Sequence, residues 1–209
     1  MEKQDIINGI TCGTIYFCQL NYIYRADKDI VLAAVKKDGR NLQYVSKKLQ
    51  SDKEVVLAAI SNYGKALQYA SRKFRLDKEI VLAAVSNDGM ALRYASQKLK
   101  SDIEVVFVAV QNNRDALMFA DLSIRALISK KAKSILNASR LTGLSIIDYR
   151  PIINDLIDGM LNIKDNPSER KITYLAIIYI LLGIKDYPKL VEELGNKVNT
   201  SFDKSIRQK

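Results

Sequence analysis

The sequence contains no histidine, and only two cysteines and three prolines among its 209 residues. Without histidine, Ser-His and Cys-His catalytic pairs cannot form, and imidazole ligands for a metal are excluded. The two cysteines, Cys12 and Cys18, are six positions apart, which fits neither a C-x-x-C redox pair nor half of a zinc site. We expect two reduced thiols packed inside the protein, and neither a metal nor another cofactor.

Long hydrophobic runs are also missing. The longest covers residues 172–184, which is 13 residues, whereas a membrane-spanning helix needs roughly 18 to 20. This run predicts a buried helix instead. The first 19 residues mix acidic and polar side chains with apolar ones, unlike a secretory signal. Together these features predict a soluble protein of the cytoplasm.

Positive charge, by contrast, is in excess, with a net charge of +10. Half of the excess lies in residues 1–126 and half in residues 127–209, so it is not gathered in one tail. A field of this sign favours acidic partners such as phosphates, anionic lipid surfaces or acidic proteins.

A repeat fills the middle of the chain. Four similar segments begin at Asp27, Asp52, Asp77 and Asp102, in steps of 25 residues. The second and third segments agree at 16 of 25 positions. Such self-similarity is typical of a repeat array, in which neighbouring units share one continuous core.

Each segment predicts two short helices. The aspartate at its start suits an N-cap, and the apolar run that follows, residues 80–85 in the third copy, predicts the first helix. Asp88-Gly89 ends this helix, because glycine suits a left-handed C′ position. Gly39 and Gly64 hold the same place, whereas the fourth copy has Asn113-Arg114.

The second helix carries apolar side chains three and four positions apart, in the third copy Leu92, Ala95 and Leu99. Aromatic residues recur at one position, where we expect them to wedge between adjacent repeats: Tyr44, Tyr69, Tyr94 and Phe119. Neither helix exceeds roughly ten residues, which is too short to persist alone in water. A single copy would therefore need its neighbours for stability.

The expected fold class is all-α: an α-solenoid of short helical hairpins with a 25-residue period, followed by a C-terminal helical module. We expect residues 1–26 to form an N-terminal capping helix or half-repeat, and residues 27–126 to form the four hairpins. Residues 127–209 predict a module of four or five helices with a frayed tail. Within it, Asn166-Pro167 predicts a helix start.

The pattern D-x-E-[IV]-V-L-A-A-V-x-x-[DN]-G-x-A-L-x-Y-A-S-x-x-L, as it stands in residues 77–99, resembles a repeat family known as domain of unknown function 4116. The resemblance covers residues 27–125 and weakens in the fourth copy. The family occurs in intracellular bacteria, including proteins delivered into host cells, and in large DNA viruses and protists. It brings no catalytic residues, and it implies a binding or effector role, with delivery into a host cell as one expectation.

The first functional hypothesis is a non-enzymatic protein-protein interaction module, either a bacterial effector or a regulator of one, that binds another protein through an acidic surface of that partner. We expect the partner to contact exposed positions of the second helices: Lys48, Gln68, Arg72, Lys73, Arg93 and Lys98. Loop residues are secondary candidates: Arg40, Tyr63 and Lys65.

The second hypothesis is an anion-binding protein that acts on nucleic acid or phosphoinositide membranes. Two repeat positions are basic in successive copies and would form ladders along a stacked array: Lys48, Lys73 and Lys98, and Arg75, Lys100 and Arg125. The tyrosines four residues before the lysines would share a helix face with them and could stack on bases. A simpler account leaves these cations solvated, where they complement helix dipoles.

A third hypothesis places an enzyme site in the C-terminal module, around a predicted turn and helix start: Asp148, Tyr149, Arg150, Asp155 and Asp158. The sequence contains no phosphate-binding loop, no dinucleotide fingerprint and no metal-ligand cluster. We therefore expect no catalytic residues and no enzyme activity.

Overall fold

The structure is a computed structural model that describes residues 2–141 and 166–182. The chain divides into two compact units, Met1–Asp121 and Leu122–Lys209, which are treated separately below. Every regular element among the described residues is helical, and the first unit is a tandem array. The expected all-α repeat solenoid is therefore confirmed.

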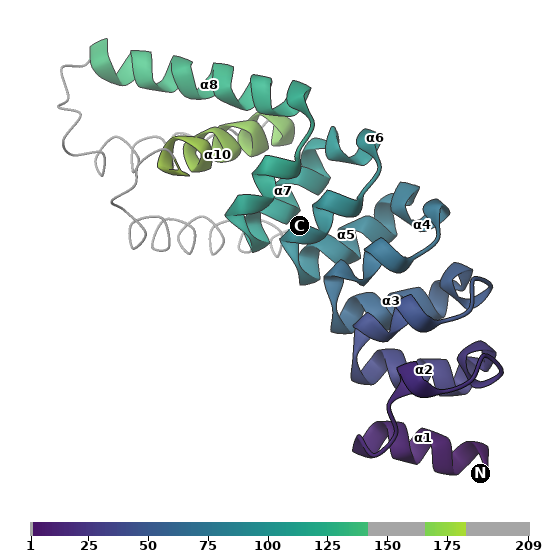
Figure 1. Cartoon of the computed structure of the whole chain (residues 1–209). Coiled ribbons are helices and arrows are strands. Elements are labelled where there is room, and N and C mark those ends of the chain that lie inside the picture. Colours follow the sequence, from purple (N-terminus) through teal and green to yellow (C-terminus); the bar gives the residue numbers. More distant parts are fainter. Residues whose placement is uncertain (1, 142–165, 183–209) are drawn as a thin grey trace. The chain divides into compact units, whose positions relative to one another are not determined.

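Five helices of ten residues lie side by side in succession in the first unit (Figure 1). They are α1 (Lys3–Cys12), α2 (Lys28–Lys37), α3 (Lys53–Asn62), α5 (Lys78–Asn87) and α7 (Ile103–Asn112). The last four each begin after one of the repeated aspartates, whose carboxylate accepts hydrogen bonds from backbone amides of the first turn. The predicted N-caps are confirmed.

After each of these first helices comes a 3-10 helix, and most repeats then add a short third element. The 3-10 helices are η1 (Phe17–Gln19), η3 (Gly39–Tyr44), η5 (Gly64–Tyr69), η6 (Gly89–Tyr94) and η7 (Arg114–Phe119). The third elements are η2 (Tyr24–Ala26), η4 (Leu49–Ser51), α4 (Arg72–Leu76) and α6 (Gln97–Lys100). Residues 2–26, predicted as a capping helix or half-repeat, thus contain all three elements of a repeat.

The prediction of one continuous second helix was wrong, because each is broken by an extended residue. Ala95, between η6 and α6, has φ −65° and ψ 158°. The break frees the next backbone amide, and Ser96 N donates to the carbonyl of Arg75 in the preceding repeat at 2.9 Å. The same bond recurs at Ser46, Ser71 and Asp121, with lengths of 3.0–3.1 Å. The predicted apolar stripe of Leu92, Ala95 and Leu99 is nevertheless buried.

The glycines after the first helices were expected in the left-handed region, and this too was wrong. Among the described residues, only Gly13 has a positive φ, 87°. Gly39, Gly64 and Gly89 are needed for another reason, because the backbone of the next repeat lies close to each of them. A β-carbon on Gly89 would lie 2.2 Å from the carbonyl oxygen of Ala109 in the next repeat. For Gly39 and Gly64 the corresponding distances are 2.3 and 2.6 Å.

An asparagine at the end of α3, α5 and α7 joins each of these helices to the repeat before. The side chain of Asn87 accepts from the amide of Gly64 at 2.8 Å and donates to the carbonyl of Ser61 at 2.9 Å. Asn62 and Asn112 make the equivalent bonds to their preceding repeats. These bonds satisfy a buried glycine amide and a helix-end carbonyl that would otherwise lack partners.

In the second unit, α8 (Leu122–Leu141) packs against α10 (Pro167–Leu182), with Ile128 and Leu175 fully buried. The predicted start of α10 is confirmed, since Asn166 accepts a hydrogen bond from the amide of Glu169 at 3.0 Å. Lys131 of α8 forms an ion pair with Glu169. Because α8 begins at Leu122, it runs across the predicted domain boundary between residues 126 and 127.

Several expectations concern other parts of the chain. Residues 142–165 and 183–209, which were predicted to belong to the C-terminal helical module and its frayed tail, lie outside the described residues. None of the described helices is long and apolar enough to cross a membrane. Cys12 and Cys18 are free but exposed, so the expectation of packed thiols was wrong.

Candidate functional site

Ion pairs join successive repeats along the starts of the first helices. The ammonium groups of Lys3, Lys28 and Lys78 lie 2.8–2.9 Å from the carboxylates of the next N-cap aspartates, Asp27, Asp52 and Asp102. Lys53 is the exception, because it lies 3.6 Å from Glu79 instead. The acids at the third position of each repeat are Asp29, Glu54, Glu79 and Glu104. We call them, together with these lysines and N-cap aspartates, the ion-pair ladder.

Three of the N-cap aspartates, Asp27, Asp52 and Asp102, have lowered pKa values. The hydrogen bond from Lys28 holds the pKa of Asp52 below its ordinary value, against an opposing effect of burial. Burial raises the pKa values of Asp27 and Asp102, but hydrogen bonds from a lysine and from backbone amides outweigh it and lower both. The carboxylates of Asp27, Asp52 and Asp102 are thus stabilised in their charged form.

Replacing Asp52 with asparagine should lower stability at neutral pH but not in acid. Asparagine still caps the helix, so the variant loses only the charge pairing with Lys28. A lowered pKa contributes stability above its ordinary value of 3.8 that is lost as the pH falls through the lower folded value. We expect a lower urea midpoint than wild type at pH 7, and a smaller difference below about pH 4.

Asp77→Asn is the matched control, because Asp77 caps its helix without an ion pair among the described residues. Equal pH dependence of the two variants would contradict this account.

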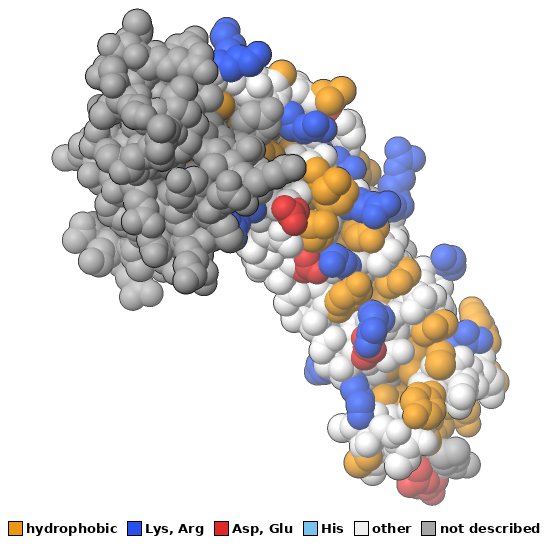
Figure 2. All heavy atoms as spheres, turned by 60° about the vertical axis from the view of Figure 1, so that its left-hand side comes forward, with side chains coloured by type: hydrophobic (Ala, Val, Ile, Leu, Met, Phe, Trp, Pro, Cys, Tyr) orange, Lys and Arg blue, Asp and Glu red, His pale blue; other side chains and the backbone are white. Residues whose placement is uncertain are grey.

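The segments that follow the 3-10 helices carry a different charge pattern. Residues 46–51, 71–76 and 96–101 contain seven cations and no carboxylate: Lys47, Lys48, Arg72, Lys73, Arg75, Lys98 and Lys100. We call these seven residues the basic row. No ion pair of the described residues involves any of them. The ladder has more carboxylates than lysines, so the positive charge of this unit resides in places such as the basic row. Lysine and arginine side chains also outnumber acidic ones on the repeats seen in Figure 2.

Four of the predicted contact residues lie in the basic row and are exposed: Lys48, Arg72, Lys73 and Lys98. The ammonium group of Lys73 also lies 4.8 Å from the ring centroid of Phe74. Gln68 is half-buried on η5, and exposed Arg93 on η6 lies 5.8 Å from the ring centroid of Phe119. The predicted lysine ladder therefore stands on the third elements of the repeats and the residues just before them.

The residues predicted to lie in loops are elsewhere: Arg40 belongs to η3 and Lys65 to η5, and both form ion pairs. Arg40 pairs with Asp38 at 2.9 Å, and Lys65 pairs with Asp88 at 3.1 Å across a repeat junction. Tyr63 is half-buried at the start of η5. Because they follow the first helices directly, these three residues do not extend the basic row.

The proposed sharing of a helix face by the tyrosines and the lysines was wrong. Tyr69 ends η5 and Lys73 lies in α4, with extended Ala70 between them, so the four-residue spacing does not place them on one face. Each of the four aromatic residues is instead the last residue of a 3-10 helix. Tyr44 is 39 % exposed, and Tyr69, Tyr94 and Phe119 are half-buried. Burial and the neighbouring tyrosines raise the pKa of Tyr69.

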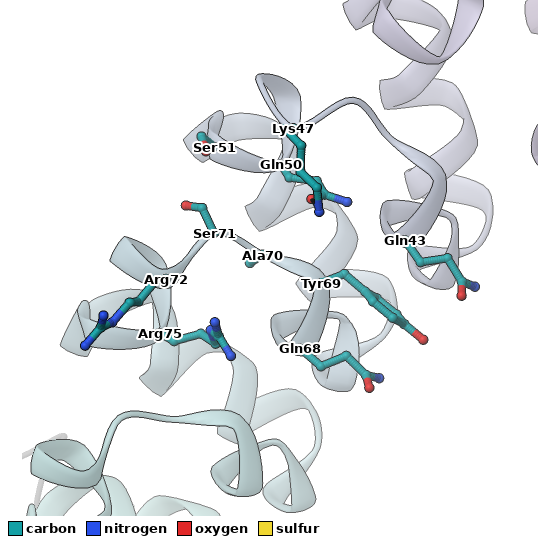
Figure 3. Close-up of a pocket in the computed structure, with 10 residues that line it drawn as sticks. All are labelled: Gln43, Lys47, Gln50, Ser51, Gln68, Tyr69, Ala70, Ser71, Arg72 and Arg75. Carbon is teal, nitrogen blue, oxygen red and sulfur yellow. Dashed lines mark hydrogen bonds between the residues drawn. The ribbon is translucent and has the colours of Figure 1, made fainter. Parts of the chain in front are cut away.

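A pocket of about 440 Å³ opens at the junction between the repeats that begin at Asp27 and Asp52 (Figure 3). In the close-up, Lys47 and Gln50 lie on one side of it, Arg72 and Arg75 lie on the other, and the Ala70–Ser71 backbone runs between them. The lining is completed by Gln43, Ser51, Gln68 and Tyr69. Three cations, Lys47, Arg72 and Arg75, thus line a pocket whose lining contains no carboxylate.

Two polar side-chain atoms of this pocket are buried without a hydrogen-bond partner, the hydroxyl oxygen of Ser71 and Nε of Arg75. Buried donors of this kind are costly unless they are paired, since desolvation is not compensated. Lys47 donates to Gln50 at 3.2 Å, and Gln50 donates to the carbonyl of Leu42, which fixes the opposite wall. Two side chains that line the pocket, Ser71 and Arg75, therefore each hold a buried donor without an internal partner.

The predictions had named only part of this pocket. Gln68, Arg72 and Arg75 were predicted as contact or anion-binding residues, whereas Lys47, Gln50 and Ser71 were missed. A signal for Lys47 was present, because it shares its repeat position with Arg72. Arg125, predicted beside Arg75 and Lys100, belongs to α8 of the second unit. The residues of the third hypothesis, from Asp148 to Asp158, lie outside the described residues.

The repeat array matches a known protein family. The model of a family described as a domain of unknown function, DUF4116, matches twice in tandem, at residues 27–75 and 77–125. Residues 27–125 belong to the DUF4116 family. The resemblance stated from the repeated motif is thereby confirmed.

Each DUF4116 match spans two of the 25-residue repeats, and the second match ends inside α8. The pocket lies wholly within the first DUF4116 match, between its two repeats. Neither the curated proteins nor the solved structures include a match to this chain. The chemistry of the pocket and of the basic row has therefore to be argued from their own residues.

Proposed function

We propose that the DUF4116 repeats form a protein-binding module that holds an acidic, extended segment of another protein along the basic row. The observation that carries the proposal is the presence of seven cations without a carboxylate among them, none of which makes an ion pair with a described residue. Cations that make no ion pair with a described residue can attract an acidic ligand and steer its approach.

A protein ligand fits the surroundings of the row better than a nucleic acid. The side chains of Gln43 and Gln68 line the pocket beside the row, and an amide both donates and accepts, as a peptide main chain requires. A nucleic acid that binds by stacking needs exposed ring faces. Of the aromatic residues that recur at one repeat position, Tyr69, Tyr94 and Phe119 are half-buried on the 3-10 helices, and Tyr44 is exposed, at 39 %.

The cellular setting stays a prediction. A role as a bacterial effector, or as a regulator of one, in a host cell came from the family resemblance, and the matched family is described only as a domain of unknown function. Nucleic acid and anionic membranes remain the competing ligands, and they enter the test below as outcomes.

The double variant Lys73→Glu/Lys98→Glu should bind an acidic peptide about tenfold or more weakly than wild type, because two attractive contacts become repulsive. The measurement is fluorescence anisotropy with a labelled 12-residue peptide of glutamate and glycine at moderate salt. Lys130→Glu/Lys133→Glu is the matched control: it makes the same change in net charge on exposed lysines of α8 in the second unit.

Equal losses in the two double variants would show that only net charge matters, and would contradict binding along the row. Tighter binding of a single-stranded oligonucleotide or of anionic vesicles than of the peptide, lost in Lys73→Glu/Lys98→Glu, would assign the row to the competing function.

A further inference from the structure

The pocket at the junction between the repeats that begin at Asp27 and Asp52 is lined by side chains with buried donors. The exposed lysines of the basic row have no such donors. Four buried side-chain atoms among the described residues lack a hydrogen-bond partner: Arg25 Nε, Ser46 Oγ, Ser71 Oγ and Arg75 Nε. Two of them, on Ser71 and Arg75, line this pocket. Solvated surface lysines need no further partner, but a buried guanidinium N–H and a buried hydroxyl do.

We infer that this pocket binds a phosphate monoester, carried on a phosphorylated side chain of the acidic segment that the basic row holds. The inference rests on the proposed function for the source of the phosphate. Its ligand chemistry rests on the three cations, Lys47, Arg72 and Arg75, that line the pocket without a carboxylate.

Charge favours a phosphate monoester over a carboxylate. A carboxylate brings one negative charge and two oxygens, whereas a phosphate monoester brings a charge of about −1.5 to −2 and three acceptor oxygens. Arg75 offers a planar fork that matches two of these oxygens, and the Ser71 hydroxyl can donate to a third. Arg72 and Lys47 supply the remaining positive charge from either side (Figure 3).

The equivalent junctions on either side lack part of this arrangement. At the preceding junction Tyr22 takes the place of Lys47, although Arg25 and Ser46 again hold unpartnered atoms there. At the following junction Ser96 is already used as a cap, accepting the amide of Leu99 at 3.4 Å. Gln97, which is uncharged, stands in the place of Arg72 and bonds to Asp121 of the repeat that begins at Asp102. Only the junction of this pocket therefore combines the three cations with a free serine and arginine.

The test compares two labelled 12-residue peptides of glutamate, glycine and serine that have the same total charge, one of which contains a single phosphoserine. We expect the phosphopeptide to bind wild type about tenfold more tightly, as a charge-assisted, bidentate contact allows. In Arg75→Gln this preference should fall to about twofold or less, whereas in Lys36→Gln, an exposed cation outside the row, it should persist. The Nε–H resonance of Arg75 should shift on addition of the phosphopeptide but not of the other peptide.

The outcomes separate the inference from the proposed function. Equal binding of both peptides by wild type overturns the phosphate site and leaves the row intact. Failure of both peptides to bind overturns the proposed function. Tighter binding of phosphoinositide vesicles than of the phosphopeptide, or binding of inorganic phosphate alone with no peptide preference, overturns the assigned source. If Arg75→Gln loses its native circular dichroism spectrum, Ser71→Ala takes its place, and it should weaken the preference for the phosphopeptide.

Discussion

Replacing Gly89 with alanine is expected to destabilise the protein by about 3 kcal/mol, the upper end of the cost of overpacking. The new β-carbon would lie 2.2 Å from the carbonyl oxygen of Ala109 and 3.0 Å from the amide nitrogen of Asn113. Both atoms belong to the backbone of the next repeat, so a rotamer change cannot relieve the clash. The repeats would have to move apart, and the junction would lose packing.

Whether Gly89→Ala lowers or raises the stability shows why the glycine is needed. A loss indicates a close neighbouring backbone, and a gain indicates that only the flexibility of the unfolded chain has changed. Gly89 does not have a positive φ, and alanine at such a position would otherwise stabilise by about 0.4 to 1 kcal/mol by reducing the entropy of the unfolded chain. Arg114→Ala is the matched control, because Arg114 takes the same repeat position in the fourth copy and already carries a side chain. Urea unfolding followed by circular dichroism should show a large loss of stability for Gly89→Ala and little for Arg114→Ala. A stabilised Gly89→Ala would contradict the packing described above.

Replacing Asn87 with alanine should cost about 2 kcal/mol, because it leaves two backbone groups of the preceding repeat without partners. The amide of Gly64 and the carbonyl of Ser61 both bond to this side chain. Gly64 is buried, so water cannot readily replace the bond to its amide.

The same urea measurement tests this prediction, with Lys37→Ala as control. Lys37 takes the same repeat position in the first copy and contacts the exposed carbonyl of Thr11. We expect a clearly smaller effect for Lys37→Ala, since water can solvate the exposed carbonyl of Thr11 that it leaves. Similar losses for the two variants would mean that the asparagine bonds do not hold the repeats together.

The sequence predicted the parts of the fold that depend on local chemistry. Asp27, Asp52, Asp77 and Asp102 cap successive helices as expected, because an aspartate before an apolar run satisfies amides that lie within a few residues. Asn166 follows the same rule. Features set by the neighbouring repeat could not be predicted in this way.

The glycines illustrate this limit. A glycine after a helix is consistent with a left-handed turn or with close approach, and only the position of Ala109 against Gly89 decides between them. Likewise, the break at Ala95 depends on the carbonyl of Arg75, which accepts the amide of Ser96 from another repeat.

The sequence predicted the basic row but not the pocket, because the pocket depends on contacts between neighbouring repeats. Lys48, Lys73 and Lys98 share one position of the repeat, so a periodic pattern predicts a row. The pocket joins different positions of two repeats, Lys47 and Gln50 with Ser71 and Arg75, and periodicity alone does not bring them together. The buried hydroxyl of Ser71 carried no signal in the sequence, because serine also recurs there as the cap Ser96.

The most direct test of the account is to map the acidic peptide on the folded protein by nuclear magnetic resonance. Titration of the ¹⁵N-labelled full chain should shift backbone amides of residues 46–51, 71–76 and 96–101, and the shifts should weaken as salt is added. Largest shifts at Arg40, Tyr63 and Lys65, or in residues 122–209, would contradict the assignment of binding to the basic row.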